Sequence, residues 1–90
     1  MPNHRERWTD MFSKEATRLV KDLKGNPRLQ AEIRAIILRG KEVFDTYETP
    51  ADAALAVAEL EASLVRELGY DIDAFGWQIN AKKIFRAAQY

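Results

Sequence analysis

The residues of this chain that could carry out chemistry are carboxylates, lysines, tyrosines and one histidine, His4. There is no cysteine, so a zinc site, a Cys–His pair and a Ser–His–Asp triad all need residues that the sequence lacks. A helical di-iron site needs Glu-x-x-His on each of two helices, and no such pair occurs. The four glycines form no phosphate-binding loop. We therefore expect no metal, no cofactor and no enzymatic activity.

Acidic residues are the remaining candidates for a cation site. Glu42, Asp45 and Glu48 are spaced by three residues and precede Asp52. A calcium loop needs closer alternation of ligands around a central glycine, which this stretch lacks. We interpret these four acids as a solvated face.

Glu61 is the one acid of its helix whose position suggests partial burial, because it falls beside Ala54 and Leu68 at the margin of an apolar face. Such a glutamate more often extends to water or pairs with another side chain than acts as a general base. An enzyme would have to combine Glu or Asp with Lys or Tyr in a cleft that the sequence does not reveal, and we rank this function third.

Four helices must position these side chains. Apolar periodicity predicts them at about 4–24, 27–47, 50–68 and 74–88, which makes residues 1–90 a single all-α domain, either a compact bundle or an orthogonal array. The turns are marked by Gly25-Asn26-Pro27, Thr49-Pro50 and Gly69–Asp73, in which Asn26, Thr49 and Asp71 or Asp73 are suited to cap helices.

The predicted helix from Leu29 to Tyr47 is the central one. Gly40 lies within its main apolar stripe, where its cost of about 1 kcal/mol relative to alanine suggests the close approach of another helix. We expect the first helix to pack its own stripe, Trp8, Phe12, Ala16, Leu19 and Leu23, against this central stripe. The third helix carries its larger apolar residues on one face with Ala53 and Ala54, and the small residues Ala51, Ala58 and Ala62 beside them are expected to permit close packing. The members of the central stripe are Leu29, Ile33, Ile36, Ile37, Val43, Phe44 and Tyr47, and those of the third helix are Val57, Leu60, Leu64, Val65 and Leu68.

A second apolar face on the central helix consists of Ala31, Ala35 and Leu38, which are turned away from the main stripe. A small domain has few internal partners for such a face, which favours an interface with another protein or within a homodimer. The alternative is burial under the fourth helix, near Phe75 and Ile79.

The zero net charge hides three blocks. Residues 1–41 carry a net charge of +5, residues 42–73 carry −8 and residues 74–90 carry +3. The interpretation we favour is that these blocks offset each other within the monomer. The alternative is that one block faces a partner: the acidic candidates are Glu59 and Glu67, and the basic ones are Lys14, Arg18, Lys21, Lys82, Lys83 and Arg86.

These observations predict a small non-catalytic protein that acts by docking on a protein partner, as an inhibitor, adaptor or small subunit. The alternative is a nucleic-acid-associated protein that uses the first helix and the C-terminal basic cluster. No apolar run reaches the roughly 20 residues that span a bilayer, and the stretch Met1–Trp8 is charged, so we expect a cytoplasmic protein without a membrane association.

Overall fold

Four α-helices form the part of the chain that the structure describes. The computed structural model describes the backbone of residues 4–90 and the side chains from Lys14 onward, so the side chains of His4, Trp8 and Phe12 lie outside what is described. The helices are α1 (His4–Leu23), α2 (Pro27–Phe44), α3 (Pro50–Glu67) and α4 (Ala74–Ala87), and residues 4–90 contain no strand. The all-α prediction is confirmed. No helix in this range is long and apolar enough to cross a membrane.

The turn between α1 and α2 forms as its residues predict. Gly25 adopts a φ of 75°, a left-handed conformation that glycine tolerates without strain, and the side chain of Asn26 accepts a hydrogen bond from the backbone N–H of Leu29 at 3.1 Å. Pro27 then occupies the first position of α2.

The caps of the last two helices differ from each other. Asp73 caps α4 by accepting a hydrogen bond from the backbone N–H of Gly76 at 2.7 Å. Thr49 makes no such bond at the start of α3, because its hydroxyl donates to the carboxylate of Asp52 at 2.7 Å. The position of the third helix was therefore predicted correctly, but its side-chain cap was not.

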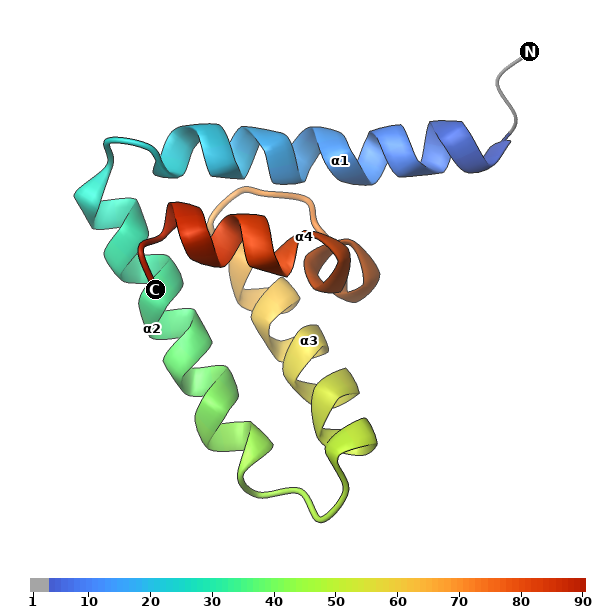
Figure 1. Ribbon diagram of the computed structural model, residues 1–90, viewed down its shortest axis with the longest axis vertical. Helices are drawn as coiled ribbons and strands as arrows, with labels where there is room; N and C mark the ends of the chain where they lie inside the picture. Colours follow the sequence, from blue (N-terminus) through green and yellow to red (C-terminus); the bar gives the residue numbers. More distant parts are fainter. Residues whose placement is uncertain (1–3) are drawn as a thin grey trace.

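The helices are arranged as a crossed array. Figure 1 shows α2 and α3 as an antiparallel pair, with α1 crossing above their ends and α4 between α1 and this pair. Helix α1 packs chiefly on α4 and touches α2 only slightly. The expectation that the first stripe packs on the central stripe was therefore wrong, because the chain from α3 returns α4 into the space beneath α1.

The core lies where α4 meets the other three helices. Trp77 of α4 is 1% exposed, and Ile72 of the preceding connection is also 1% exposed. Both are surrounded by buried residues from every helix. The largest fully buried side chains are Trp77, Leu19, Leu23, Ile33, Ile72, Ile84 and Val65.

Helix α2 ends three residues before the predicted boundary. The hydroxyl of Thr46 donates to the backbone carbonyl of Val43 at 2.7 Å, and its backbone N–H bonds the same oxygen at 3.0 Å, which closes the last turn. Phe44 and Tyr47, predicted as core residues, are 42% and 46% exposed, and Tyr47 lies beyond the end of α2.

Helix α3 buries its small residues, which were expected to permit close packing, more completely than its leucines. Ala53, Ala58, Ala62 and Val65 are buried, whereas Leu60, Leu64 and Leu68 are only partly covered and Val57 lines a groove. The buried face is turned toward the alanines, whose small side chains let neighbouring helices come close.

Candidate functional site

A groove at the junction of α2, α3 and the chain end beyond α4 contains the carboxyl group of Glu61. Its volume is about 310 Å³, near the lower limit of about 300 Å³ for small-molecule sites. Helix α2, helix α3 and the C-terminal end of the chain from Phe85 onward each contribute residues to its lining. The lining residues are Ile37, Gly40, Lys41, Phe44, Val57, Glu61, Phe85 and Tyr90.

Gly40 makes room for this carboxyl group. A Cβ atom at position 40 would lie 2.9 Å from Cδ of Glu61, 3.0 Å from its Oε2 and 3.0 Å from Cγ1 of Val57. Any larger residue would push α3 or the carboxyl group away. The prediction that Gly40 permits a close helix approach is confirmed, and the helix that approaches is α3.

Glu61 is 5% exposed, which confirms its predicted burial. Its Oε1 accepts a hydrogen bond from the indole Nε1–H of Trp77 at 3.3 Å, a long bond by usual criteria. Its Oε2 accepts no hydrogen bond from any described residue, yet it is not sealed from solvent, so it is open to the groove. Burial raises the pKa of Glu61 to about 7, and the bond from Trp77 opposes this rise only in part. No described cation forms an ion pair with it.

Aromatic rings border the groove beside Glu61. The Phe85 ring lies 6.1 Å from that of Trp77 and 5.7 Å from that of Tyr90, the latter edge to face. Phe44 stands on the α2 side, and both Phe44 and Tyr90 keep about half of their surface in solvent. Several aromatic rings therefore lie close to the carboxyl group of Glu61.

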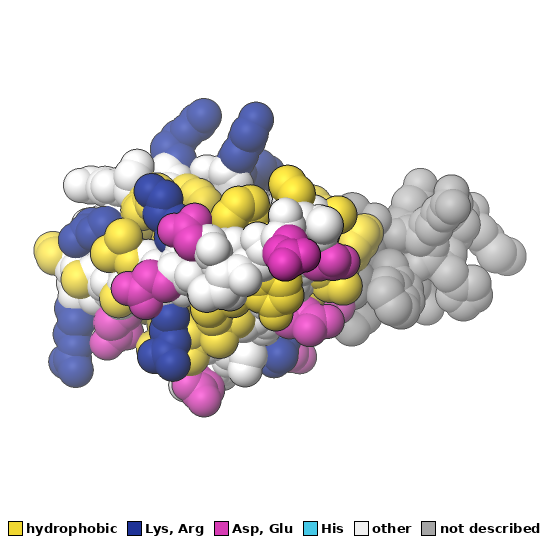
Figure 2. All heavy atoms as spheres, turned by 90° about the horizontal axis from the view of Figure 1, so that it is seen from below, with side chains coloured by type: hydrophobic (Ala, Val, Ile, Leu, Met, Phe, Trp, Pro, Cys, Tyr) yellow, Lys and Arg dark blue, Asp and Glu magenta, His cyan; other side chains and the backbone are white. Residues whose placement is uncertain are grey.

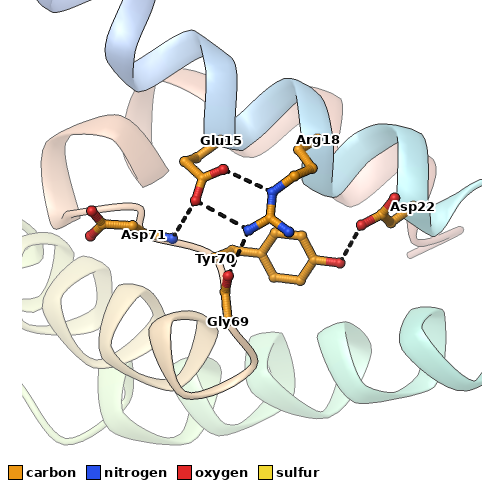
Figure 3. A network of polar contacts seen from close by, with 6 residues as sticks. All are labelled: Glu15, Arg18, Asp22, Gly69, Tyr70 and Asp71. Carbon is orange, nitrogen blue, oxygen red and sulfur yellow. Dashed lines mark hydrogen bonds and ion pairs between the residues drawn. The ribbon is translucent and has the colours of Figure 1, made fainter.

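A polar network attaches α1 to the connection between α3 and α4 (Figure 3). Arg18 donates to Glu15 at 2.8 and 3.1 Å and to the backbone carbonyl of Gly69 at 2.6 Å. Its guanidinium also lies 4.4 Å from the centre of the Tyr70 ring, within cation–π range. The hydrogen bonds from Arg18 and then from the backbone of Asp71 lower the pKa of Glu15.

Tyr70 completes the network from the other side. Its hydroxyl donates to the carboxylate of Asp22 at 2.6 Å, and the residue is only 7% exposed. Burial, reinforced by this bond, raises the pKa of Tyr70 to about 12. The six residues of Figure 3 therefore serve to hold α1 in place.

This network divides the basic row predicted on the first helix. Arg18 is engaged within the molecule, while Lys14 and Lys21 are exposed. The three residues therefore do not form one free cationic surface, because Arg18 points its charge at Glu15 and Tyr70.

The C-terminal basic cluster lines a second groove only in part. Lys83 and Arg86 of α4 line a groove of about 500 Å³ together with Lys24, which follows α1, whereas Lys82 is exposed and does not line this groove. No acidic side chain is among the lining residues, which are Val20, Lys24, Gly25, Gln30, Lys83, Arg86, Ala87 and Gln89.

The second apolar face of α2 is open. Ala31 and Ala35 are exposed, and Leu38 is 53% exposed. The alternative of burial under the fourth helix was wrong: Phe75 and Ile79 are themselves 59% and 60% exposed, and α4 barely contacts α2.

The two acidic candidates on α3, Glu59 and Glu67, are exposed. Two ion pairs are found among the described side chains, and each joins residues of the same helix: Arg18–Glu15 in α1 and Arg28–Glu32 in α2. No described ion pair therefore joins α3 to a basic helix. No three of the described His, Asp and Glu side chains are placed to hold a metal ion.

Two buried polar contacts were missed at the sequence level. Gln30 is 8% exposed and donates to the backbone carbonyl of Leu23 at 2.8 Å, which satisfies the end of α1. Arg34 donates to the backbone carbonyl of Ala88 at 2.9 Å at the end of α4. Gln30 follows Leu29 of the apolar stripe and lies close to the turn after α1. This nearness to the turn was the sequence signal for a contact with the end of α1.

Seen from the end that carries the α2–α3 turn, the surface has hydrophobic side chains open between acidic and basic ones (Figure 2). Comparison of the chain with protein-family models, curated proteins and solved structures finds no match.

Proposed function

We propose that this protein is a small, non-catalytic docking protein that presents the outer face of α2, formed by Ala31, Ala35 and Leu38, to another protein, acting in the cytoplasm. The occupant we propose is a second copy of the chain.

The exposure of Leu38 is the observation that carries this proposal. Leu38 keeps 53% of its surface in solvent although it lies within a helix whose other side packs on α3. Ala31 and Ala35 lie beside it, and their small side chains permit a second helix to come close. Covering a leucine contributes about 1.5–3 kcal/mol when it is complete, so a partner helix gains by packing here.

Charges at the ends of this face favour a second copy. Arg28 precedes Ala35 by seven residues and Glu42 follows it by seven, which puts all three on one heptad position. Two antiparallel α2 helices related by a two-fold axis near Ala35 bring Arg28 of each copy toward Glu42 of the other. The same pairing sets Leu38 beside the small Ala31. Arg28 is free to reorient, because its side chain is 92% exposed and its bond to Glu32 is 3.8 Å long.

Sedimentation equilibrium over a concentration series tests this arrangement. We expect the wild type to dimerise and Leu38→Asp to stay monomeric with unchanged helicity, because a charge at this position is desolvated only in the dimer. Leu55→Asp is the matched control: Leu55 is 56% exposed on α3, away from this face, and its replacement should leave the dimer intact.

A charge swap tests the register. Arg28→Glu should weaken the dimer, and the combination with Glu42→Arg should restore it. A wild type that remains monomeric at about 1 mM would exclude the second copy as occupant. Docking on a different protein would then be tested by affinity capture with nuclease present. It requires that the wild type recover a partner that Leu38→Asp does not recover. Equal recovery of the partner by both proteins would exclude the α2 face as the docking surface.

Nucleic-acid association is the second candidate, and the groove with Lys24, Lys83 and Arg86 favours it. When cationic side chains contact phosphates, the logarithm of the affinity for the nucleic acid falls linearly with the logarithm of the salt concentration. A fluorescent single-stranded oligonucleotide should therefore bind the wild type with a steep salt slope that the Lys83→Gln and Arg86→Gln variants reduce. Binding with no change of slope in these variants would exclude this groove.

A further inference from the structure

We propose that the groove over Glu61 binds the ammonium group of an organic amine, with the Glu61 carboxylate as its anionic partner and the surrounding apolar residues as the site for its carbon stem. The proposal is independent of docking through the α2 face.

The state of Glu61 is the first support. The residue is only 5% exposed, yet its Oε2 has no hydrogen-bond donor among the described residues and opens into the groove. Its one described polar partner, Trp77, is an uncharged donor at 3.3 Å. A buried carboxylate without a cation is costly, and a cation that reaches Oε2 relieves this cost.

The walls of the groove are the second support. Ile37 and Val57 provide aliphatic surface, and Phe44, Phe85 and Tyr90 provide aromatic surface on both sides. Ammonium groups are attracted to the faces of aromatic rings as well as to carboxylates. A volume of about 310 Å³ admits an amine with a short hydrocarbon or phenyl stem.

The glycine at position 40 is the third support. Glycine inside a helix costs about 1 kcal/mol relative to alanine, and here it keeps open the space that the Glu61 carboxyl occupies, within 3.0 Å of a Cβ atom at that position. Alanine at position 61 would remove both the close contacts with position 40 and the charge. The glycine therefore accommodates a carboxyl group where a small apolar side chain would also fit.

Lys41 is the counter-argument that the test must include. It lines the same groove from α2 and carries a positive charge that repels an ammonium ion. It is exposed, so water and salt screen this repulsion. Lys41→Gln should therefore tighten amine binding modestly, whereas a site for an anion would lose affinity through this change.

Nuclear magnetic resonance titration with 2-phenylethylamine, observed at the indole N–H signal of Trp77, tests the proposal. We expect saturable binding that is at least about tenfold weaker in Glu61→Gln, which keeps the shape and an acceptor for Trp77 but removes the charge. The neutral isostere 2-phenylethanol should not discriminate between the two proteins. The ammonium group of a lysine side chain carries the same chemistry. A parallel titration with Nα-acetyl-lysine N-methylamide, whose side-chain ammonium is free, therefore distinguishes a small organic amine from a lysine within a peptide.

A pH series of amine titrations with the wild type provides a second measurement, and the same series with Glu61→Gln is its control. Because Glu61 must be ionised to bind, wild-type affinity should fall by about tenfold or more from about pH 8 to about pH 5. Lys41 and Tyr90, the other titratable groups that line the groove, are present in Glu61→Gln as well, so the difference between the two proteins reports on Glu61. Three results would each overturn the proposal. They are equal amine affinity in wild type and Glu61→Gln, binding of 2-phenylethanol to the wild type as tight as that of 2-phenylethylamine, and a wild-type amine affinity that does not change with pH.

Discussion

Gly40 of α2 and Glu61 of α3 occupy complementary positions: a Cβ atom at position 40 would lie 2.9 Å from Cδ of Glu61. The approach of α3 to α2, the burial of the carboxyl group and its shifted pKa all depend on this pair. One missing side chain therefore links helix packing to the chemistry of the groove.

Gly40→Ala should destabilise the protein although alanine is the better helix former. The gain in helix propensity of about 1 kcal/mol is smaller than the cost of overpacking, about 1–3 kcal/mol. In a Glu61→Ala background two of the three close contacts disappear, so the same change should become less costly or stabilising. Chemical denaturation of the four proteins measures this coupling, and identical effects of Gly40→Ala in both backgrounds would show that the two positions are independent.

The stability of the fold should decrease as pH rises through the range set by Glu61. Its pKa is raised from 4.5 to about 7, so the folded chain holds this proton more tightly than the unfolded chain. The stabilisation is fully present below about pH 4.5 and is lost by about pH 7. Because Oε2 keeps contact with water, we expect a loss of about 1–3 kcal/mol, less than the whole shift implies.

Glu61→Gln should abolish this pH dependence and be more stable than the wild type above about pH 7. Denaturation at a series of pH values measures the difference, and Glu59→Gln on the exposed side of the same helix is the matched control. Parallel wild-type and Glu61→Gln profiles would mean that Glu61 titrates normally.

Tyr70→Phe should cost about 1–2 kcal/mol, since it removes a 2.6 Å hydrogen bond to a carboxylate while it keeps the ring. Tyr70→Ala should cost about 3–5 kcal/mol, because the buried ring and its contact with Arg18 are lost as well. Asp22→Ala combined with Tyr70→Phe should cost little more than either change alone. Additive losses would place the origin of the effect outside this bond.

Arg18→Ala should lower the melting temperature more than Lys21→Ala. Both are exposed cationic residues of α1, but only Arg18 contacts Glu15, the carbonyl of Gly69 and the ring of Tyr70. Arg18→Lys should not restore the loss, because one ammonium cannot reproduce the planar fork and the stacking. Equal melting temperatures for Arg18→Ala and Lys21→Ala would mean that the contacts of Arg18 do not stabilise the fold and that Arg18 acts as a free surface cation.

The features that were predictable from sequence are those set by near neighbours in the chain. Asn26 with Pro27, and the glycines at positions 25 and 69, define turns through local backbone chemistry. Gly40 was informative because glycine weakens a helix, so its place within an apolar stripe indicates that a neighbouring helix needs the space.

The features that were missed depend on which helices meet. Packing of α1 on α4 places Tyr70 and Ile72 in the interior, although both lie in a short connection with no periodicity to indicate burial. On α3, the hydrophobicity of the leucines favoured one face, but the close approach that Gly40 allows favours the alanines and Glu61. The groove over Glu61 could not be predicted, because its walls come from three helices whose contacts are not local.

The acidic face of α3 offers a last prediction, because Glu59 and Glu67 make no ion pair that joins them to another helix. Their double reversal to lysine raises the net charge from zero to +4. We expect a change of no more than about 0.5 kcal/mol in the free energy of unfolding, as for surface positions without contacts. If a basic partner docks here, the reversal should also slow its association and flatten the salt dependence, as surface plasmon resonance can measure. An unchanged association rate together with a lower melting temperature would mean that these acids serve the electrostatics of the fold and not a docking surface.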